Sequence, residues 1–381
     1  MVTHRYIFAD LLSNNILTEL PMRRVRIEQR LNEVGSFIGY AKLSDPNVQK
    51  LFPWSQTPGG RTALYVDRDG TLLWGGIVVT RRYSEGPVAP QSIGAFDLEI
   101  GASEFFWYFR DKAVIATDQT FTAVEQMTIP GSLISYEQGK GTANNIGVNV
   151  PSFPASGVLR TVSWKGVDRK KVGAAIVDIA QLDQGFDWMI RVGYGLGGQP
   201  AGTPGKQLAL GCPRLGSPYN ITGWQFEYPG NIVDYTWAED SSQQAITAYV
   251  QGSGAGASMV QSSNTITSFL DAGYPDLQEV FRAKDQTDPN VIAARAVSAA
   301  KTYSQPVALL YLLVRTDLDP VLGSYSVGDD ALVRLTSKQF PAPASGGPGY
   351  SGYWRILARR IQPQEEAQPE RVLLTMGAPP T

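Results

Sequence analysis

Ser298 and Lys301 stand three positions apart, which is the spacing of the nucleophilic serine and the lysine in serine acyl enzymes. In that chemistry a basic group accepts the hydroxyl proton as the serine oxygen attacks a carbonyl. The other motifs that accompany this pair in such enzymes are missing, and both residues lie late in an alanine-rich stretch with helical periodicity. The pair therefore indicates an ordinary helix.

A glycine-rich segment at residues 252–257, GSGAGA, matches the loose form of a dinucleotide-binding loop. Such a loop binds the pyrophosphate only when a helix follows, because the N–H groups of the first helical turn hold the phosphates. The residues that follow, SMVQSSNTITS, are poor helix formers. Residues 252–268 are therefore interpreted as a mobile loop or linker, and an oxidoreductase is the weakest alternative.

Two further sequences resemble ion-binding loops. Asp67 and Asp69 could open a calcium loop, but the twelfth position holds Val78 in place of the glutamate that completes an EF-hand. Lys206 follows a glycine, but a phosphate-binding loop would need glycine where Pro200 stands. We predict a hairpin turn at the first sequence and no phosphate site at the second.

Five carboxylates lie in two clusters, Asp234 with Glu239 and Asp240, and Asp329 with Asp330. A glycosidase needs two carboxylates that face each other across a cleft. Most of these five occur in turn-like sequences, where aspartate is common because its side chain accepts hydrogen bonds from the backbone. They are interpreted as turn residues.

The chain has one histidine, His4, and one cysteine, Cys212. Hydrolytic triads and zinc sites commonly need histidine, and a cysteine metal site or an internal disulfide needs more than one thiol. We therefore predict no catalytic, cofactor-binding or metal-binding residues.

Composition is that of an ordinary globular protein. Of 381 residues, 43% are hydrophobic and 18% charged, and the net charge is −2, so bulk charge does not favour a nucleic-acid surface. The length suggests about two or three domains. No signal peptide or membrane-spanning run is apparent, and we expect a soluble protein made in a reducing cytoplasm.

Two stretches have the alternating pattern of β-hairpins. In residues 230–254, Val233, Tyr235 and Trp237 alternate with polar or small residues before a turn and a second alternating run. In residues 61–82, Asp69-Gly70 is a strong two-residue hairpin signal, followed by Trp74. We predict that these hairpins are equivalent centres of two small β-barrels.

The remaining pattern is mostly short strands. Residues 1–82 hold about six of them, which suggests a barrel or sandwich. Phe105, Phe106 and Phe109 predict a core-packing helix after an N-cap at Ser103, with a stacking platform for bases or sugars as the minor alternative. Helices are also predicted from Asp168 to 184, at 274–281 and at 288–304, followed by a strand at 307–314 and a hairpin at 353–376.

These elements predict a mainly β (α+β) fold with two tail-tube-like β-barrels and a mixed α/β domain built from two discontinuous segments. The first barrel spans residues 1–96. The mixed domain takes 97–218 and 255–304, the second barrel takes 219–254 and 305–376, and residues 377–381 form a tail.

Three sequences together carry a resemblance to a known family: YIFADLL at 6–12 with LTELP at 17–21, GNIVDYTW at 230–237, and LGSYSVGDDA at 322–331. The chain resembles the minor tail proteins, or baseplate hubs, of long-tailed actinobacterial phages. The resemblance implies a fold related to contractile-tail hubs and type VI secretion spike proteins. It also implies a homotrimer in which two barrels per chain form a ring of six.

The resemblance implies a structural role in the virion, at the distal end of the tail. The implied partners are the distal tail ring, the tip or central fibre proteins, the C-terminus of the tape measure protein, and DNA in transit without sequence-specific binding or stable membrane insertion. The chain ends soon after Met376 without the lytic domain of some members, so no enzyme is implied. A carbohydrate-binding or cell-wall-degrading tail protein is the alternative.

Overall fold

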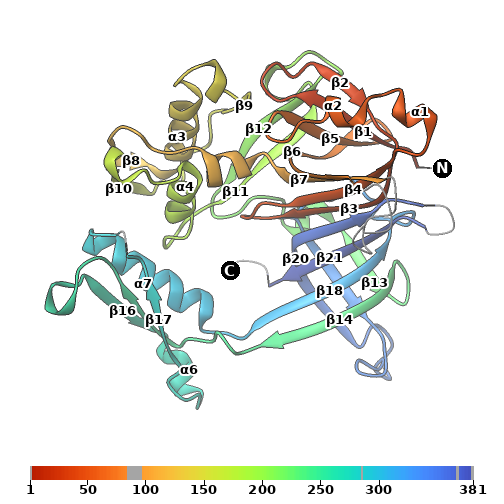
Figure 1. Cartoon of the computed structure of the whole chain (residues 1–381). Helices are drawn as coiled ribbons and strands as arrows, with labels where there is room; N and C mark the ends of the chain where they lie inside the picture. The colour runs from red at the N-terminus through yellow and green to blue at the C-terminus, as the bar shows by residue number, and fades with distance from the viewer. Residues whose placement is uncertain (1, 84–96, 285, 366–368, 379–381) are drawn as a thin grey trace.

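A computed structural model describes residues 2–83, 97–284, 286–365 and 369–378 (Figure 1). Strands make up 43% of the chain and helices 20%, which confirms a mainly β fold. None of the helices in these ranges combines the length and the apolar character that crossing a membrane requires.

The N-terminal quarter of the chain forms seven strands of one large sheet. Two short helices, α1 and α2, interrupt the strands. The elements are β1 (His4–Asp10), β2 (Ile16–Glu19), β3 (Met22–Arg30), β4 (Ser36–Lys42), α1 (Pro46–Gln49), α2 (Pro53–Gln56), β5 (Thr62–Arg68), β6 (Thr71–Tyr83) and β7 (Asp97–Glu104).

The C-terminal part of the chain adds six strands to the same sheet. Together they give thirteen strands, and the described strands do not close into a barrel. The two expected barrels are therefore two halves of one open sheet. The added strands are β13 (Gln225–Tyr228), β14 (Ile232–Asp240), β18 (Val307–Arg315), β19 (Asp330–Leu335), β20 (Tyr350–Gln362) and β21 (Arg371–Gly377).

Residues 108–222 form a mixed region that packs against the N-terminal half of the sheet (Figure 1). Its core contains the predicted aromatic cluster, since Phe105, Phe106 and Phe109 are almost completely buried and Phe106 stacks on Trp188 at 3.9 Å between ring centroids. The expected cap, Ser103, instead lies within β7, which ends at Glu104. The main elements are η1 (Tyr108–Lys112), β8 (Gln119–Glu125), α3 (Ile129–Gln138), β9 (Val148–Asn149), β10 (Leu159–Trp164), α4 (Val172–Ala180), β11 (Asp187–Tyr194), β12 (Pro204–Gly211) and α5 (Tyr219–Thr222).

A small separate unit, which we call the α7 unit, lies between β14 and β18 in the chain. Figure 1 shows it below the mixed region, with β14 leading towards it and β18 leading away. Two predictions are wrong here. Part of the expected loop at 252–268 is the strand β16, and the helix expected at 274–281 is absent, since residues 278–281 belong to the strand β17. The elements are β15 (Thr247–Gln251), η6 (Gly256–Ser258), β16 (Gln261–Thr265), α6 (Thr267–Asp271), β17 (Gln278–Arg282) and α7 (Pro289–Tyr303).

The predicted hairpin at 61–82 is present, and the predicted hairpin at 230–254 is wrong. β5 pairs with β6 across a turn in which Asp69 and Gly70 have φ of 49° and 84°, the left-handed values of a type I′ turn. By contrast, β14 pairs with β18, while β15 pairs with β16 and β17. The alternation identified both strands of the second stretch correctly, but they belong to different sheets.

Candidate assembly interface

The motifs that suggested chemistry take structural roles in the described chain. Lys301 lies near the end of α7, and its Nζ is 2.7 Å from Asp183 Oδ1. The glycine-rich loop leads through η6 into β16, so no helix N-terminus follows it to hold a pyrophosphate.

Lys206 is buried, and its Nζ donates to the carbonyl oxygens of Leu11 and Ile146. Burial lowers the pKa of Lys206 to about 7.

Of the paired carboxylates, only Asp329 lies at a turn. Asp330 begins β19, and Asp234, Glu239 and Asp240 lie in β14, so the interpretation as turn residues is wrong for these four. Asp329 accepts from the backbone N–H groups of Ser217 and Ser326, at 2.8 and 2.9 Å. Asp330 forms a 2.6 Å ion pair with Arg214. In the described ranges, no three or more His, Cys, Asp or Glu side chains are grouped so that they could hold a metal ion.

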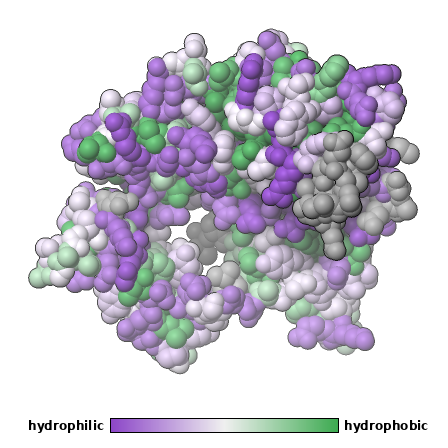
Figure 2. All heavy atoms as spheres, in the orientation of Figure 1, coloured by the Kyte–Doolittle hydropathy of each residue, from purple (hydrophilic) through white to green (hydrophobic). Residues whose placement is uncertain are grey.

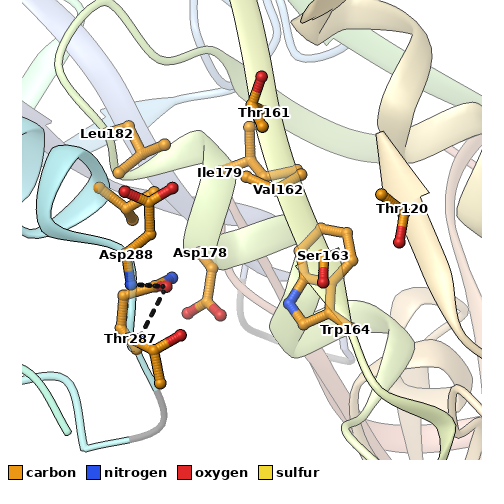
Figure 3. Close-up of a pocket in the computed structure, with 12 residues that line it drawn as sticks. Thr120, Thr161, Val162, Ser163, Trp164, Asp178, Ile179, Leu182, Thr287 and Asp288 are labelled. Carbon is orange, nitrogen blue, oxygen red and sulfur yellow. Dashed lines mark hydrogen bonds between the residues drawn. The ribbon is translucent and has the colours of Figure 1, made fainter. Parts of the chain in front are cut away.

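A hollow between β10, α4 and the start of α7 was the remaining candidate for a ligand site (Figure 3). Its carboxylates are already engaged. Asp178 lies 2.5 Å from Lys170 and 2.9 Å from Arg295, and Asp288 accepts a 2.8 Å hydrogen bond from Asn290 as the N-cap of α7. The pair of Asp178 with Arg295 attaches the α7 unit to the mixed region, and none of these contacts indicates a chemical role for the hollow.

The large sheet contains the same strand order twice. The first repeat consists of β1 and β3–β7, with the order β1-β5-β6-β7-β4-β3. The second repeat consists of β13, β14 and β18–β21, with the order β13-β19-β20-β21-β18-β14. Numbered by chain position within each repeat, both orders read 1-4-5-6-3-2. They differ in the first pair, which is antiparallel in the first repeat and parallel in the second.

Local geometry confirms the match between β6 and β20, each 13 residues long. Both have a β-bulge against the next strand, after Val78 and after Ile356. In both strands the carbonyl just before the bulge accepts a 2.7 Å hydrogen bond. The Gly60 N–H donates to Val78 in β6, and the Gly328 N–H donates to Ile356 in β20. Both glycines have positive φ and lie two positions before the next strand of their repeat.

This match aligns the sequences VVTRR at 78–82 and ILARR at 356–360. It also corrects the predicted equivalence of Trp74 and Trp237. Trp237 lies on β14, whereas the tryptophan on the counterpart of β6 is Trp354, on β20. Trp74 and Trp354 are both buried, at 0% and 5% exposure. The Arg-Arg pairs at 81–82 and 359–360 are a further sign of the duplication, which the predictions from sequence did not use.

The two repeats meet where β3 pairs antiparallel with the second half of β20. We call this contact the internal joint. Arg359, buried in it, donates to Gln29 Oε1 at 2.9 Å and to the carbonyl oxygens of Tyr325 and Leu73 at 3.0 and 3.4 Å. On the other face of the strand, Arg360 lies 3.4 Å from Glu28. The second arginine pair therefore fixes the register between the repeats.

A buried ion pair links the repeats at another point. Arg68 Nη2 lies 2.8 Å from Glu370 Oε2, and His4 Nε2 lies 3.1 Å from Glu370 Oε1. Burial by itself would raise the pKa of Glu370, but the hydrogen bonds from His4 and Arg68 outweigh it and lower the pKa to about 2. The single histidine thus has a structural role at the contact between the repeats.

Glu104, at the end of β7, should make stability depend on pH. It is buried and accepts a 2.7 Å hydrogen bond from the Gly35 N–H, and burial raises its pKa from 4.5 to about 8. Between these values the folded chain holds a proton that the unfolded chain has lost. The contribution of Glu104 to the free energy of unfolding is therefore complete below pH 4.5. It is lost as the pH rises to about 8, by at most roughly 1.4 kcal/mol for each pH unit.

We expect Glu104→Gln to flatten this slope in the free energy of unfolding measured from pH 5 to 9. The control is Glu33→Gln, since the Glu33 side chain is 62% exposed and the slope should remain. An unchanged slope in the Glu104 variant would contradict the assignment.

Similarity to solved structures agrees with this architecture, although the sequence matches no family model and no curated protein. A tail protein from Neisseria meningitidis MC58 is 11% identical, with a TM-score of 0.59, over 98% of this chain and 96% of its own. The 43 kDa tail protein of prophage MuSo2 from Shewanella oneidensis is 10% identical, with a TM-score of 0.60, over 98% of both chains.

A chain of the lidded Francisella PdpA–VgrG complex is 8% identical, with a TM-score of 0.51, over 99% of this chain and 52% of its own. At these identities the similarity establishes a shared fold. The resemblance to tail-hub and spike proteins is thus confirmed for the fold.

Proposed function

We propose that this chain is a structural hub protein at the distal end of a phage tail, acting as a homotrimer. The observation that carries the proposal is the duplicated six-stranded repeat within one chain. The fold shared with two tail proteins along almost their whole length supports it. The origin in an actinobacterial phage remains a prediction.

The duplication gives a physical reason for such a role. A ring of six identical tube subunits offers six equal docking edges. Three copies of a chain with two similar repeats can match all six and still present three-fold symmetry on the opposite side. Strand edges that would otherwise promote aggregation would be covered by neighbours in the ring.

In this role the hub would contact the distal tail ring on one side and the tip or central fibre proteins on the other. The C-terminus of the tape measure protein would lie in the bore, and DNA would pass through without sequence-specific contacts. No catalytic activity is proposed. The hub would reside in the virion after synthesis in the host cytoplasm.

We propose domain boundaries adjusted to the strand pairing. The first repeat runs to residue 104, beyond the expected 96, because β7 pairs with β4 and β6. The second repeat uses 223–240 and 305–377, because β15 pairs within the α7 unit. The mixed region and the α7 unit form the rest.

The test is the mass of the purified chain in solution together with a low-resolution image of the tail tip. We expect three times the chain mass and three-fold density at the end of the tube. A stable monomer or dimer at high concentration, with no three-fold feature at the tip, would contradict the proposal. Clearing of peptidoglycan in a zymogram would favour the cell-wall-degrading alternative.

A further inference from the structure

Among the residues that the structure describes, two strand edges at opposite parts of the sheet have no neighbouring strand. In the described part of the chain β14 pairs only with β18, which leaves its other edge without a strand. β5 covers one edge of β6 only as far as Ile77, and Val79, Thr80 and Arg82 beyond it are exposed. Apolar side chains on the face shown in Figure 2 form small separate patches and no single broad apolar surface.

The duplication matches each strand that has an open edge with a strand of the other repeat. β14 is the counterpart of β3, and β6 is the counterpart of β20, and β3 and β20 are the two strands of the internal joint. Both β3 and β14 have an irregularity near their start, just before Arg26 and Asp234. Aligning these positions makes residues 235–238 the counterpart of 27–30, which are the joint residues of β3.

We propose that β14 of one copy pairs antiparallel with the end of β6 of a second copy, in the register of the internal joint. This inference rests on the proposed assembly and names the surface that makes it. Thr236 would lie opposite Arg82, as Glu28 lies opposite Arg360. The Glu239 N–H would donate to the Val79 carbonyl, as the Leu31 N–H donates to that of Leu357 at 2.9 Å.

Charge supports this register. β14 carries Asp234 and Glu239 on an exposed strand, and the end of β6 carries Arg81 and Arg82. Arg82 would lie diagonal to Asp234, and Arg81 diagonal to Glu239, within reach of long side chains. Within its own chain Arg82 is 64% exposed and 3.7 Å from Glu99, so it can turn towards a second carboxylate.

Arg81 would also lie opposite Trp237. In the single copy its guanidinium stacks on Trp54, with 4.1 Å from Cζ to the ring centroid, and Trp54 is itself 52% exposed. Pairing would offer Arg81 a second aromatic face at the new strand contact. Arg81 and Arg82 of β6 would then fix the strand register between copies, as Arg359 and Arg360 fix it between the two repeats of one chain.

A disulfide in the full-length chain tests the register. In a Cys212→Ser background, Arg82→Cys with Thr236→Cys should form covalent dimers and trimers on a non-reducing gel after mild oxidation. Glu28→Cys with Arg360→Cys is the matched control, because these positions are opposite within one chain and should cross-link without a change in mass. The negative control combines Arg82→Cys with Asp240→Cys. Asp240 lies four residues, or about 13 Å, along β14 from Thr236, so this pair should not cross-link.

Glu239→Pro provides a second test that does not need a disulfide. Proline removes the N–H proposed to donate to the neighbouring copy, and an open strand edge tolerates proline. We expect the unfolding midpoint of the monomer to stay unchanged and the dissociation constant of the oligomer to rise at least about tenfold.

The outcomes separate this inference from the proposed function. A trimer that forms without the 82–236 cross-link, and is unaffected by Glu239→Pro, overturns the joint and leaves the hub in place. A cross-link within dimers or open chains, without three-fold order, supports the joint and overturns the ring. Equal cross-linking of the out-of-register pair overturns the register, and a chain that never associates overturns both proposals.

Discussion

Replacing Arg359 with methionine is expected to lower the free energy of unfolding by about 3–5 kcal/mol. The guanidinium is buried, and it donates to Gln29, Tyr325 and Leu73 from both repeats. Methionine keeps much of the apolar stem but leaves three buried acceptors without a donor. Urea unfolding followed by tryptophan fluorescence measures the loss.

Arg360→Met is the matched control for this prediction. Arg360 is the next residue on β20, its side chain is 41% exposed, and its contact is a 3.4 Å ion pair with Glu28. A partly exposed pair of this kind contributes about 0–1 kcal/mol. Equal losses for the two variants would show that the buried hydrogen bonds of Arg359 do not hold the repeats together.

Sequence reasoning succeeded where the deciding interactions are local. The turn at Asp69-Gly70 specifies the β5–β6 hairpin within a few residues. Asp288 and Pro289 specify the start of α7, because aspartate accepts from an N–H of the first turn and proline fits the first helical position. The hairpin predicted at 353–376 is also present, as β20 and β21.

Prediction from sequence failed where the partner of a strand lies far away in the chain. β14 alternates as a strand should, but its partner, β18, lies beyond the whole α7 unit in the chain. The side chain of Trp237 packs against Phe340, Tyr350 and Trp354, all of which come from even later residues. Period-two alternation reports that one face of a strand is buried and does not report which strand lies beside it.

The candidate interface was difficult to predict for the same reason. Arg-Arg occurs in the sequence at 81–82 and 359–360, and also at 23–24. Nothing local distinguishes them from other charged dipeptides, because their equivalence depends on the bulges after Val78 and Ile356. The predicted duplication was therefore right in principle, but the strand of Trp237, β14, was matched with β6, whose counterpart is β20.

Asp187 joins the mixed region to both repeats, and Asp187→Ala is expected to cost about 3–5 kcal/mol of unfolding free energy. Asp187 is 7% exposed. Its carboxylate accepts from Asn32 Nδ2 at 2.6 Å, from the Leu215 N–H at 2.8 Å and from the guanidinium of Arg355. Alanine would leave the buried Arg355 cation without its counter-ion.

The control for Asp187 is Asp317→Ala, which removes an ion pair with Arg315 whose side chains are 49% and 65% exposed, and this change should have no measurable effect. If Asp187 acts as argued, Asp187→Ala combined with Arg355→Met should be more stable than Asp187→Ala alone, because the uncompensated charge is gone. A double variant no more stable than the single one would mean that Asp187 acts mainly through Asn32 and Leu215.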